Sequence, residues 1–321
     1  MDYSVIVPVY NRPGEIDELL DSLTNQTYKN FEVIIVEDGS DQRCDHIVEK
    51  YSDRLTIRYF YKKNSGQGYS RNFGFEKATG DYFIVFDSDC LIPPHYFEEV
   101  NRALIFHGYD AWGGPDRAHH SFTPIQKAIS YSMTSFFTTG GIRGRKNHIG
   151  KFHPRSFNMG ISREVYEKTG GYKITRMGED IEFSLRIIEN GFKTGLIENA
   201  YVYHKRRTDF KQFYRQLHFF GRARINIKRF YPNELKLVHL LPVFFVIGLP
   251  ILLFLTIAAE GFLSKLLLLY PAYAFVLFVD AFNTEKNLKV SILGVIAGFI
   301  QLTAYGIGFL KELSMDYKKS A

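Results

Sequence analysis

Short apolar runs alternate with amphipathic stretches along the first third of the chain. Each run is bounded by polar or turn-forming residues, and the stretches between them carry apolar residues at helical spacing. The predicted strands cover residues 3–9, 31–38, 55–61 and 81–89, and the predicted helices cover residues 13–26, 41–51, 67–80 and 93–108. Strands of this kind, separated by helices, predict an α/β fold with a mostly parallel sheet covered on both faces.

The pattern is looser between residues 110 and 205. DAWGGPD, FNMGIS, FKTGLIE and AYVYH predict short strands, and GEDIEFSLRIIENG predicts a helix. Residues 139–155 are rich in glycine and in basic residues and predict a loop, either a clamp for phosphates or a solvated connection. Ligands of parallel sheets bind beyond the carboxyl ends of the strands, so we expect a site at the strand ends PVYN, EDGS and DSDC.

The last third of the chain is much more apolar. Residues 237–259 and 290–310 contain no Asp, Glu, Lys or Arg, and each stretch is long enough to cross a hydrocarbon core about 30 Å thick. Residues 263–282 are also apolar, with Lys265 and Asp280 near their ends. We predict three transmembrane spans at these three stretches. The alternative is a pair of buried helices in a soluble protein.

A basic segment precedes the first predicted span. Residues 205–236 hold ten Lys or Arg against Asp209 and Glu234, whereas the net charge of the whole chain is only +6. The apolar residues of this segment recur at helical spacing, which predicts amphipathic helices at a lipid surface over residues 206–236. A nucleic-acid surface is the other common use of such charge. The span that follows within a few residues favours lipid, so no nucleic-acid partner is expected.

These patterns divide the chain into four parts. We expect a catalytic domain at residues 1–205, interfacial helices at 206–236, a transmembrane region at 237–312 and a tail at 313–321. Basic residues beside a span stay on the cytoplasmic side. The catalytic domain is therefore expected in the cytoplasm, on a multi-pass protein of the inner membrane.

Two further features bear on the compartment and the topology. The N-terminus carries no basic and apolar signal segment, and Cys44 and Cys90 have neither disulfide nor zinc-site spacing, which suits a reducing compartment. Three spans, however, place the basic tail KELSMDYKKSA outside, where basic residues are disfavoured. A re-entrant middle segment would remove this conflict.

Two aspartates at the end of the fourth predicted strand indicate a metal site. Asp87 and Asp89 flank Ser88, and alternate residues of a strand share a face, so both carboxylates are expected on one side. Like charges this close repel each other unless a cation lies between them. Pairs of oxygen ligands suit Mg²⁺ or Mn²⁺. The structural alternative is a surface turn with two solvated acids.

Five further residues allow both a structural and a functional interpretation. Asp38 can bind a nucleotide or cap the next helix, and Arg71 can bind phosphate or base or be a solvated helix residue. Glu179 and Asp180 open a helix, where acids either complement the helix dipole or supply a general base. His204 ends a strand and can join the aspartates on a metal.

Five motifs occur in order along residues 3–205: VIVPVYNRP, VEDGS, GYSRNFGFEKATGDYFIVFDSDCLIPP, NMGISREVYEKTGGY and GEDIEFSLRIIENGF. Together they resemble the inverting family 2 glycosyltransferases, which have the glycosyltransferase-A fold. The resemblance implies a Rossmann-like sheet, a nucleotide-sugar donor and a divalent metal at the D-x-D. It also implies inversion by direct displacement at the anomeric carbon. UDP-sugars are the expected donors, because uracil is the usual base in the family.

The resemblance also assigns roles to single residues. Positions that line the nucleotide-sugar in the family correspond to Pro8, Tyr10, Glu37, Asp38, Arg71, Asp87 and Ser88. Metal-binding positions correspond to Asp87, Asp89 and His204. Asp180 matches the catalytic base, with Glu179 supporting it. Glu37 is a departure, since the family often has Asp there.

Three functions remain open at this stage. The first is transfer of one sugar to a hydroxyl of a lipid-linked or membrane-presented glycan. The second is a polyprenyl-phosphate glycosyl synthase, but a phosphate acceptor needs no strong base, so the GED helix favours a hydroxyl acceptor. The third is not an enzyme but a membrane scaffold or transporter with a degenerate fold, which the intact Asp87, Asp89 and Asp180 argue against. The Q-x-x-R-W motif of processive members is absent, which argues against a polymer synthase.

Overall fold

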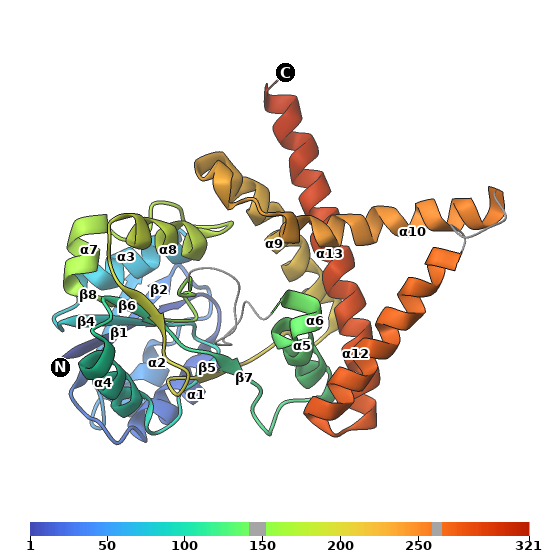
Figure 1. The fold of residues 1–321 in the computed structure, drawn as a ribbon. Coiled ribbons are helices and arrows are strands. Elements are labelled where there is room, and N and C mark those ends of the chain that lie inside the picture. The colour runs from blue at the N-terminus through green and yellow to red at the C-terminus, as the bar shows by residue number, and fades with distance from the viewer. Residues whose placement is uncertain (141–151, 259–264, 321) are drawn as a thin grey trace. The chain divides into compact units, whose positions relative to one another are not determined.

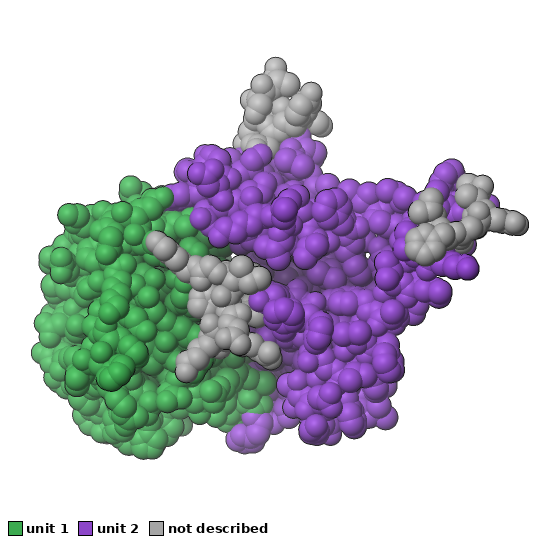
Figure 2. All heavy atoms as spheres, viewed as in Figure 1, with its two compact units in different colours: residues 1–119, 143–205 green, residues 120–142, 206–321 purple. Residues whose placement is uncertain are grey.

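The computed structural model describes residues 1–140, 152–258 and 265–320, without the side chains of 316–320. The chain forms two compact units, which Figure 2 colours separately. Unit 1 comprises Met1–His119 and Arg143–Lys205, and unit 2 comprises His120–Ile142 and Arg206–Ala321. Unit 2 therefore includes a segment, His120–Ile142, that the sequence analysis places inside the catalytic domain.

Unit 1 is built on a seven-stranded sheet with the strand order β3-β2-β1-β4-β8-β6-β9. The strands are β1 Tyr3–Val9, β2 Phe31–Asp38, β3 Thr56–Lys62, β4 Tyr82–Phe86, β6 Ala111–Gly113, β8 Asn158–Ser162 and β9 Thr194–Leu196. β8 runs antiparallel to both of its neighbours, and every other neighbouring pair is parallel. The predicted mostly parallel sheet is confirmed.

Alternate residues of the buried strands supply the cores on the two faces of this sheet. In β2, Val33 and Ile35 pack into one core, and Ile34 and Val36 pack into the other. The helices that cover the two faces (Figure 1) are α1 Pro13–Thr24, α2 Asp45–Val48, α3 Gln67–Lys77, α4 Tyr96–His107, α7 Arg163–Thr169 and α8 Glu179–Glu189. A second, three-stranded sheet has the order β5-β10-β7, from Cys90–Leu91, Val202–His204 and Asp116–Arg117.

The helix predicted at residues 41–51 is wrong in its first part. α2 begins at Asp45 and continues only as a 3-10 turn, Glu49–Tyr51. The backbone N–H groups of Asp41 and Gln42 donate instead to Asn11 Oδ1, at 2.8 and 3.0 Å. These bonds hold the segment as a loop against the end of β1, so the helix starts later.

Unit 2 is helical. Its helices are α5 Pro124–Thr134, α6 Phe136–Thr139, α9 Phe210–Phe230, α10 Leu241–Ala258, α12 Leu269–Glu285 and α13 Leu288–Ser320, with 3-10 turns at Pro232–Glu234, Leu237–Leu240 and Leu266–Leu268. The predicted basic amphipathic helix corresponds to α9. Within the described residues, three helical stretches are long and apolar enough to cross a membrane: Leu237–Ile257, Leu266–Glu285 and Leu288–Met315.

The segment α5–α6 packs on the apolar helices of unit 2. The Tyr131 hydroxyl lies 2.8 Å from Asp280 Oδ2 on α12, and the Ser135 hydroxyl donates to the same oxygen at 2.6 Å. Ile129 and Met133 of α5 share a core with residues of α9 and α13. Asp280, an acid within an apolar helix, is thus held by two hydroxyl groups from a distant part of the chain.

α9 and α13 approach each other through glycines. A Cβ added at Gly308 would lie 2.1 Å from the His218 carbonyl oxygen, and one added at Gly221 would lie 2.0 Å from the Tyr305 carbonyl oxygen. Phe213 and Leu217 of α9 pack in the same core as two alanines of α13. The backbones can lie this close only because neither glycine has a side chain.

Replacing Gly308 with Ala is expected to destabilise unit 2 by about 1–3 kcal/mol, the usual cost of overpacking. Helix propensity favours Ala over Gly by about 1 kcal/mol. A net loss of stability therefore requires that the clash of the new Cβ with the His218 carbonyl oxygen costs more than this gain. The matched control is Gly14→Ala in α1, where an added Cβ meets no atom within 4 Å. Thermal melts of the detergent-solubilised protein compare the two; an equal Tm for both variants would contradict the close crossing.

Candidate active site

Polar residues gather where β1, β2 and β4 end. These three strands are parallel neighbours, so their carboxyl ends lie at one edge of the sheet. Pro8 lies near the end of β1, and Tyr10 follows it with 51% of its surface exposed. Asp38 ends β2, and Asp87 follows β4 directly. This edge of the sheet is the candidate active site.

The sequence predicts that the D-x-D segment ends a strand, and this prediction is wrong. The segment is a turn that follows β4. β4 ends at Phe86, and the N–H of Cys90 donates to the carbonyl of Asp87 at 3.1 Å. The two carboxylates then have different partners: Asp87 Oδ1 accepts from Arg71 at 2.8 Å, and Asp89 Oδ2 accepts from Arg12 at 2.8 Å. Ser88 between them is buried.

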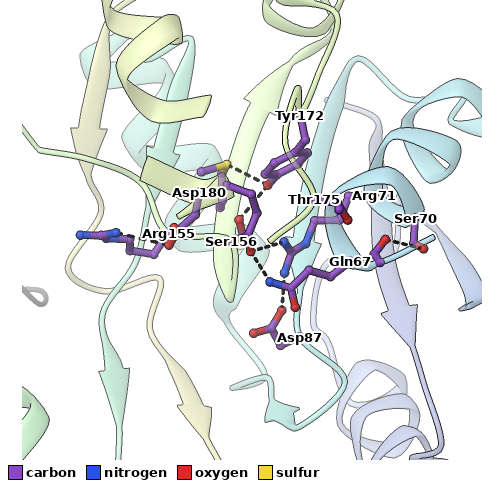
Figure 3. Close-up of polar contacts among 12 residues, drawn as sticks. Gln67, Ser70, Arg71, Asp87, Arg155, Ser156, Tyr172, Thr175 and Asp180 are labelled. Carbon is purple, nitrogen blue, oxygen red and sulfur yellow. Dashed lines mark hydrogen bonds and ion pairs between the residues drawn. The ribbon is translucent and has the colours of Figure 1, made fainter. Parts of the chain in front are cut away.

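Arg71 is buried in unit 1 and joins a buried acid, Glu179, to the partly exposed Asp87 (Figure 3). Its guanidinium is 2% exposed, lies 2.8 Å from Asp87 and 3.3 Å from Glu179 Oε1, and lies over the Tyr172 ring. Glu179 also accepts from Gln67. Burial, with the nearby charge of Asp180 added, raises the pKa of Glu179, although Arg71 opposes the shift. The pair Glu179–Arg71 fixes the start of α8 against α3.

Asp180 lies beside this buried pair and remains accessible. About a quarter of its side chain is exposed, one oxygen accepts from the N–H of Ile181, and the other lies 3.3 Å from Arg155 (Figure 3). The residue before α8, Gly178, has a left-handed backbone with φ of 100°, as does Met177 with φ of 61°. These two left-handed residues form a turn directly before α8, and Arg71 then links the first residue of α8 to Asp87 at the edge of the sheet.

Asp38 and Glu37 hold loops through contacts within the chain. Asp38 accepts from Lys62 and from the N–H groups of Ser65 and Gly66, both at 2.9 Å. Burial would raise the pKa of Asp38, but the hydrogen bonds outweigh it and lower the pKa. Glu37 is fully buried. It accepts from the hydroxyl of Ser40, the N–H of Cys44 and the hydroxyl of Tyr59. Asp38 therefore shapes the loop that opens α3, and Glu37 the loop after β2.

Asp89 and His204 meet at a second point of the site. His204 Nε2 lies 3.0 Å from Asp89 Oδ1, and the imidazole stacks on Phe157. The ligand atoms of Asp89, Cys90 and His204 all lie within 4.8 Å of one another, so they could hold a metal ion. Asp87 is not part of this group among the residues that the structure describes. Burial raises the pKa of the Cys90 thiol well above its usual value.

A family model described as Glycosyl transferase family 2 matches residues 4–170, slightly more than half of the chain. The chain belongs to this family. It is therefore a glycosyltransferase, as the order of its motifs predicts.

Relatives of this family 2 glycosyltransferase are also named glycosyltransferases. An uncharacterized glycosyltransferase of Rickettsia typhi is 41% identical over 138 residues, which cover 40% of this chain and 42% of the relative. A probable glycosyltransferase of Sulfolobus acidocaldarius is 29% identical over 225 residues, which cover 66% of this chain and 47% of the relative. The chain spans less than half the length of these two relatives.

Solved structures confirm the fold class of the glycosyltransferase. A mannosyltransferase from Pyrobaculum calidifontis, in complex with GDP-Man and Mn²⁺, is similar with a TM-score of 0.66 and 17% identity, over 93% of this chain and 86% of that one. TarS 1–349 of S. aureus, in complex with UDP-GlcNAc, is similar with a TM-score of 0.51 and 19% identity, over 100% and 92%. At this identity the similarity establishes the glycosyltransferase-A fold alone.

Three residues of this glycosyltransferase site have no individual role among the sequence-based predictions. Arg12 contacts Asp89, Gln67 contacts Glu179, and Arg155 contacts Asp180. Arg12 lies in YNRP, directly after the first predicted strand, so its position at a strand end could have marked it as a site residue. Nothing in the local pattern distinguishes Gln67 or Arg155. Residues 141–151 of the predicted basic loop 139–155 lie outside the described part of the chain.

Proposed function

We propose that this glycosyltransferase moves one sugar from a nucleoside diphosphate sugar to a hydroxyl group of a lipid-linked or membrane-presented glycan, with inversion at the anomeric carbon. The observation that carries the proposal is the pairing of an accessible acid, Asp180, with a buried acid, Glu179, at the sheet edge that also holds Asp87 and Asp89. A hydroxyl acceptor needs a base, and an accessible carboxylate supplies one.

The chemistry assigns each group a task. Asp180 accepts the proton of the acceptor hydroxyl while the oxygen of that hydroxyl bonds to the anomeric carbon. The bond between this carbon and the donor phosphate breaks, and the nucleoside diphosphate leaves with the electron pair. Arg155 donates to the Asp180 oxygen that is not bonded to the N–H of Ile181, so the acceptor hydroxyl shares this carboxylate with Arg155 or displaces it. Arg71 holds Asp87 and Glu179 in place, so these two acids are already positioned before the reaction.

Asp89 and His204 suit a divalent cation. A carboxylate and an imidazole are ligands that Mn²⁺ accepts, and His204 Nδ1 is buried without a hydrogen-bond partner among the described residues. The Cys90 thiol lies in the same group of possible ligands, and the donor phosphates are expected to complete the ligand set. Mg²⁺ or Mn²⁺ held there would neutralise the charge of the departing diphosphate. Pro8, Tyr10, Asp38 and Ser88 are proposed to line the nucleotide.

The proposed function is tested by screening the purified protein against UDP-sugars and GDP-sugars with a membrane lipid extract as acceptor. Release of the nucleoside diphosphate is expected with one donor class, loss of activity in excess EDTA, and recovery with Mn²⁺ or Mg²⁺. His204→Ala is expected to raise the metal concentration needed for half-maximal activity by at least about tenfold, as for other perturbed metal sites.

The product decides between the two acceptor classes. Mild acid frees a sugar bound directly to the lipid phosphate as a monosaccharide, whereas a sugar linked to a hydroxyl stays joined to the acceptor glycan. Release of the free monosaccharide would favour the polyprenyl-phosphate alternative, and full activity in EDTA would remove the metal from the proposal. We further propose that unit 1 faces the cytoplasm at the inner membrane, on the side of the basic helix α9.

A further inference from the structure

The contacts of α13 place two of its residues at the same face of the membrane. If α10 and α12 both cross, they run in opposite directions, so the start of α10 and the end of α12 lie on one face. α13 begins at Leu288, directly after α12 ends at Glu285. A Cβ added at Gly306 would lie 2.4 Å from the carbonyl oxygen of Pro242, at the start of α10. Leu288 and Gly306 therefore both lie near this face.

The length of helix between these two residues argues against a third span. Leu288 and Gly306 are 18 residues apart, or about 27 Å at 1.5 Å per residue. This is close to the full thickness of a hydrocarbon core, about 30 Å. A spanning α13 would carry Gly306 to the opposite face, away from the start of α10. Figure 1 shows α10 crosswise to α13, whereas packed spans usually cross at about 20–40°.

The charges of α9 support the same orientation. α9 contains six Lys or Arg and lies against the second half of α13, where the carbonyl of His218 meets Gly308. Glu312 of α13 pairs with Arg222 at 2.8 Å and with Arg229 at 2.9 Å. Cations are strongly unfavourable in hydrocarbon. A spanning α13 would draw α9 into the core of the bilayer.

The two sides of α13 meet different surroundings. Gly306 faces α10 and Gly308 faces α9; two residues on a helix are about 200° apart, so these contacts are on opposite sides. Leu288, Ile292 and Ile296 are exposed apolar residues spaced four apart, which places them on one stripe. A helix with a charged neighbour along one side and an apolar stripe along another suits the membrane interface.

We propose that only α10 and α12 cross the membrane, and that α13 lies in the interface with its apolar stripe toward lipid and with α9 along its other side. Residues 313–321 then lie on the same side as α9. The basic tail KELSMDYKKSA is thus on the side that basic residues favour, without a re-entrant segment. The inference does not depend on the proposed reaction.

Single cysteines at four exposed positions test this topology: Lys211→Cys in α9, Lys265→Cys before α12, Lys286→Cys between α12 and α13, and Ser314→Cys in α13. A membrane-impermeant maleimide is added to intact cells and to inverted vesicles. The unsubstituted chain is the background control, because Cys44 and Cys90 are buried. Labelling of positions 211, 286 and 314 from one side, and of 265 from the other, is expected.

Other labelling patterns overturn the proposal. Labelling of 314 together with 265 would show that α13 is a third span. Labelling of all four positions from one side would show that neither α10 nor α12 crosses. Because a substituted chain can fail to insert, the unsubstituted chain is also fused at its C-terminus to green fluorescent protein and, separately, to alkaline phosphatase. Fluorescence without phosphatase activity is expected, and active phosphatase would refute a tail on the cytoplasmic side.

Discussion

Replacing Asp180 with Asn is expected to lower turnover by at least about 100-fold, the scale of general-base catalysis, with donor affinity nearly unchanged. Asn has the size of Asp and can still accept the N–H of Ile181, which now bonds to Asp180 Oδ1 at 2.9 Å, so α8 should start as before. It cannot take the proton of the acceptor. Single-turnover rates and donor binding, measured separately, distinguish loss of chemistry from loss of affinity.

The matched control for this variant is Glu189→Gln, which neutralises an exposed acid at the other end of α8. It is expected to keep the turnover of the unsubstituted enzyme. If Asp180→Asn also kept that turnover, Asp180 would not be the base. If it lost donor binding to the same extent as turnover, the role of Asp180 would be to hold the donor.

Replacing Arg71 with Met is expected to destabilise unit 1 by about 3–5 kcal/mol, the cost of breaking a buried ion pair from one side. Met has a similar length but leaves the buried Glu179, and Asp87 beside it, without their cation. For a domain of this size the loss corresponds to a fall in Tm of roughly 10 °C. Thermal melts measure it, and turnover should fall with it because α8 loses its attachment to α3.

A surface pair provides the comparison for Arg71. Arg102 lies 2.6 Å from Glu99, but its side chain is 70% exposed. Arg102→Met is expected to change stability by less than about 1 kcal/mol, because solvent screens such pairs. Equal effects of the two substitutions would mean that the bridge made by Arg71 is as solvated as a surface pair.

The sheet of unit 1 could be predicted because its strands are encoded locally. In β2 every residue is buried, and its alternate side chains serve two cores, so the apolar run alone identifies a central strand. The end of β4 was misplaced by three residues, because Asp87 and Asp89 follow an apolar run and nothing in the run marks Phe86 as its last member. The turn arises from contacts with Arg71 and Arg12, which are distant in sequence.

The partners of the site residues could not be predicted for the same reason. Gln67 and Glu179 are 112 positions apart in the sequence, and only the packed structure brings α3 and α8 together. The arrangement of unit 2 has the same origin. In the described part of the chain, hydropathy identifies three apolar helices, but only the contacts of Gly306 and Gly308 show that the third one packs against α10 and α9.

The chain passes between its two units three times, after His119, before Arg143 and after Lys205. An anchor joined by a single link can be removed or exchanged by cutting the chain once. Here a chain ended at Lys205 would keep α5 and α6 but lose the helices that cover Ile129 and Met133, and the exposed apolar surface would favour aggregation. Unit 2 is therefore not a separate C-terminal segment. Gene fusions that cut the chain at residue 205 would separate residues 206–321 from His120–Ile142, which belongs to the same compact unit.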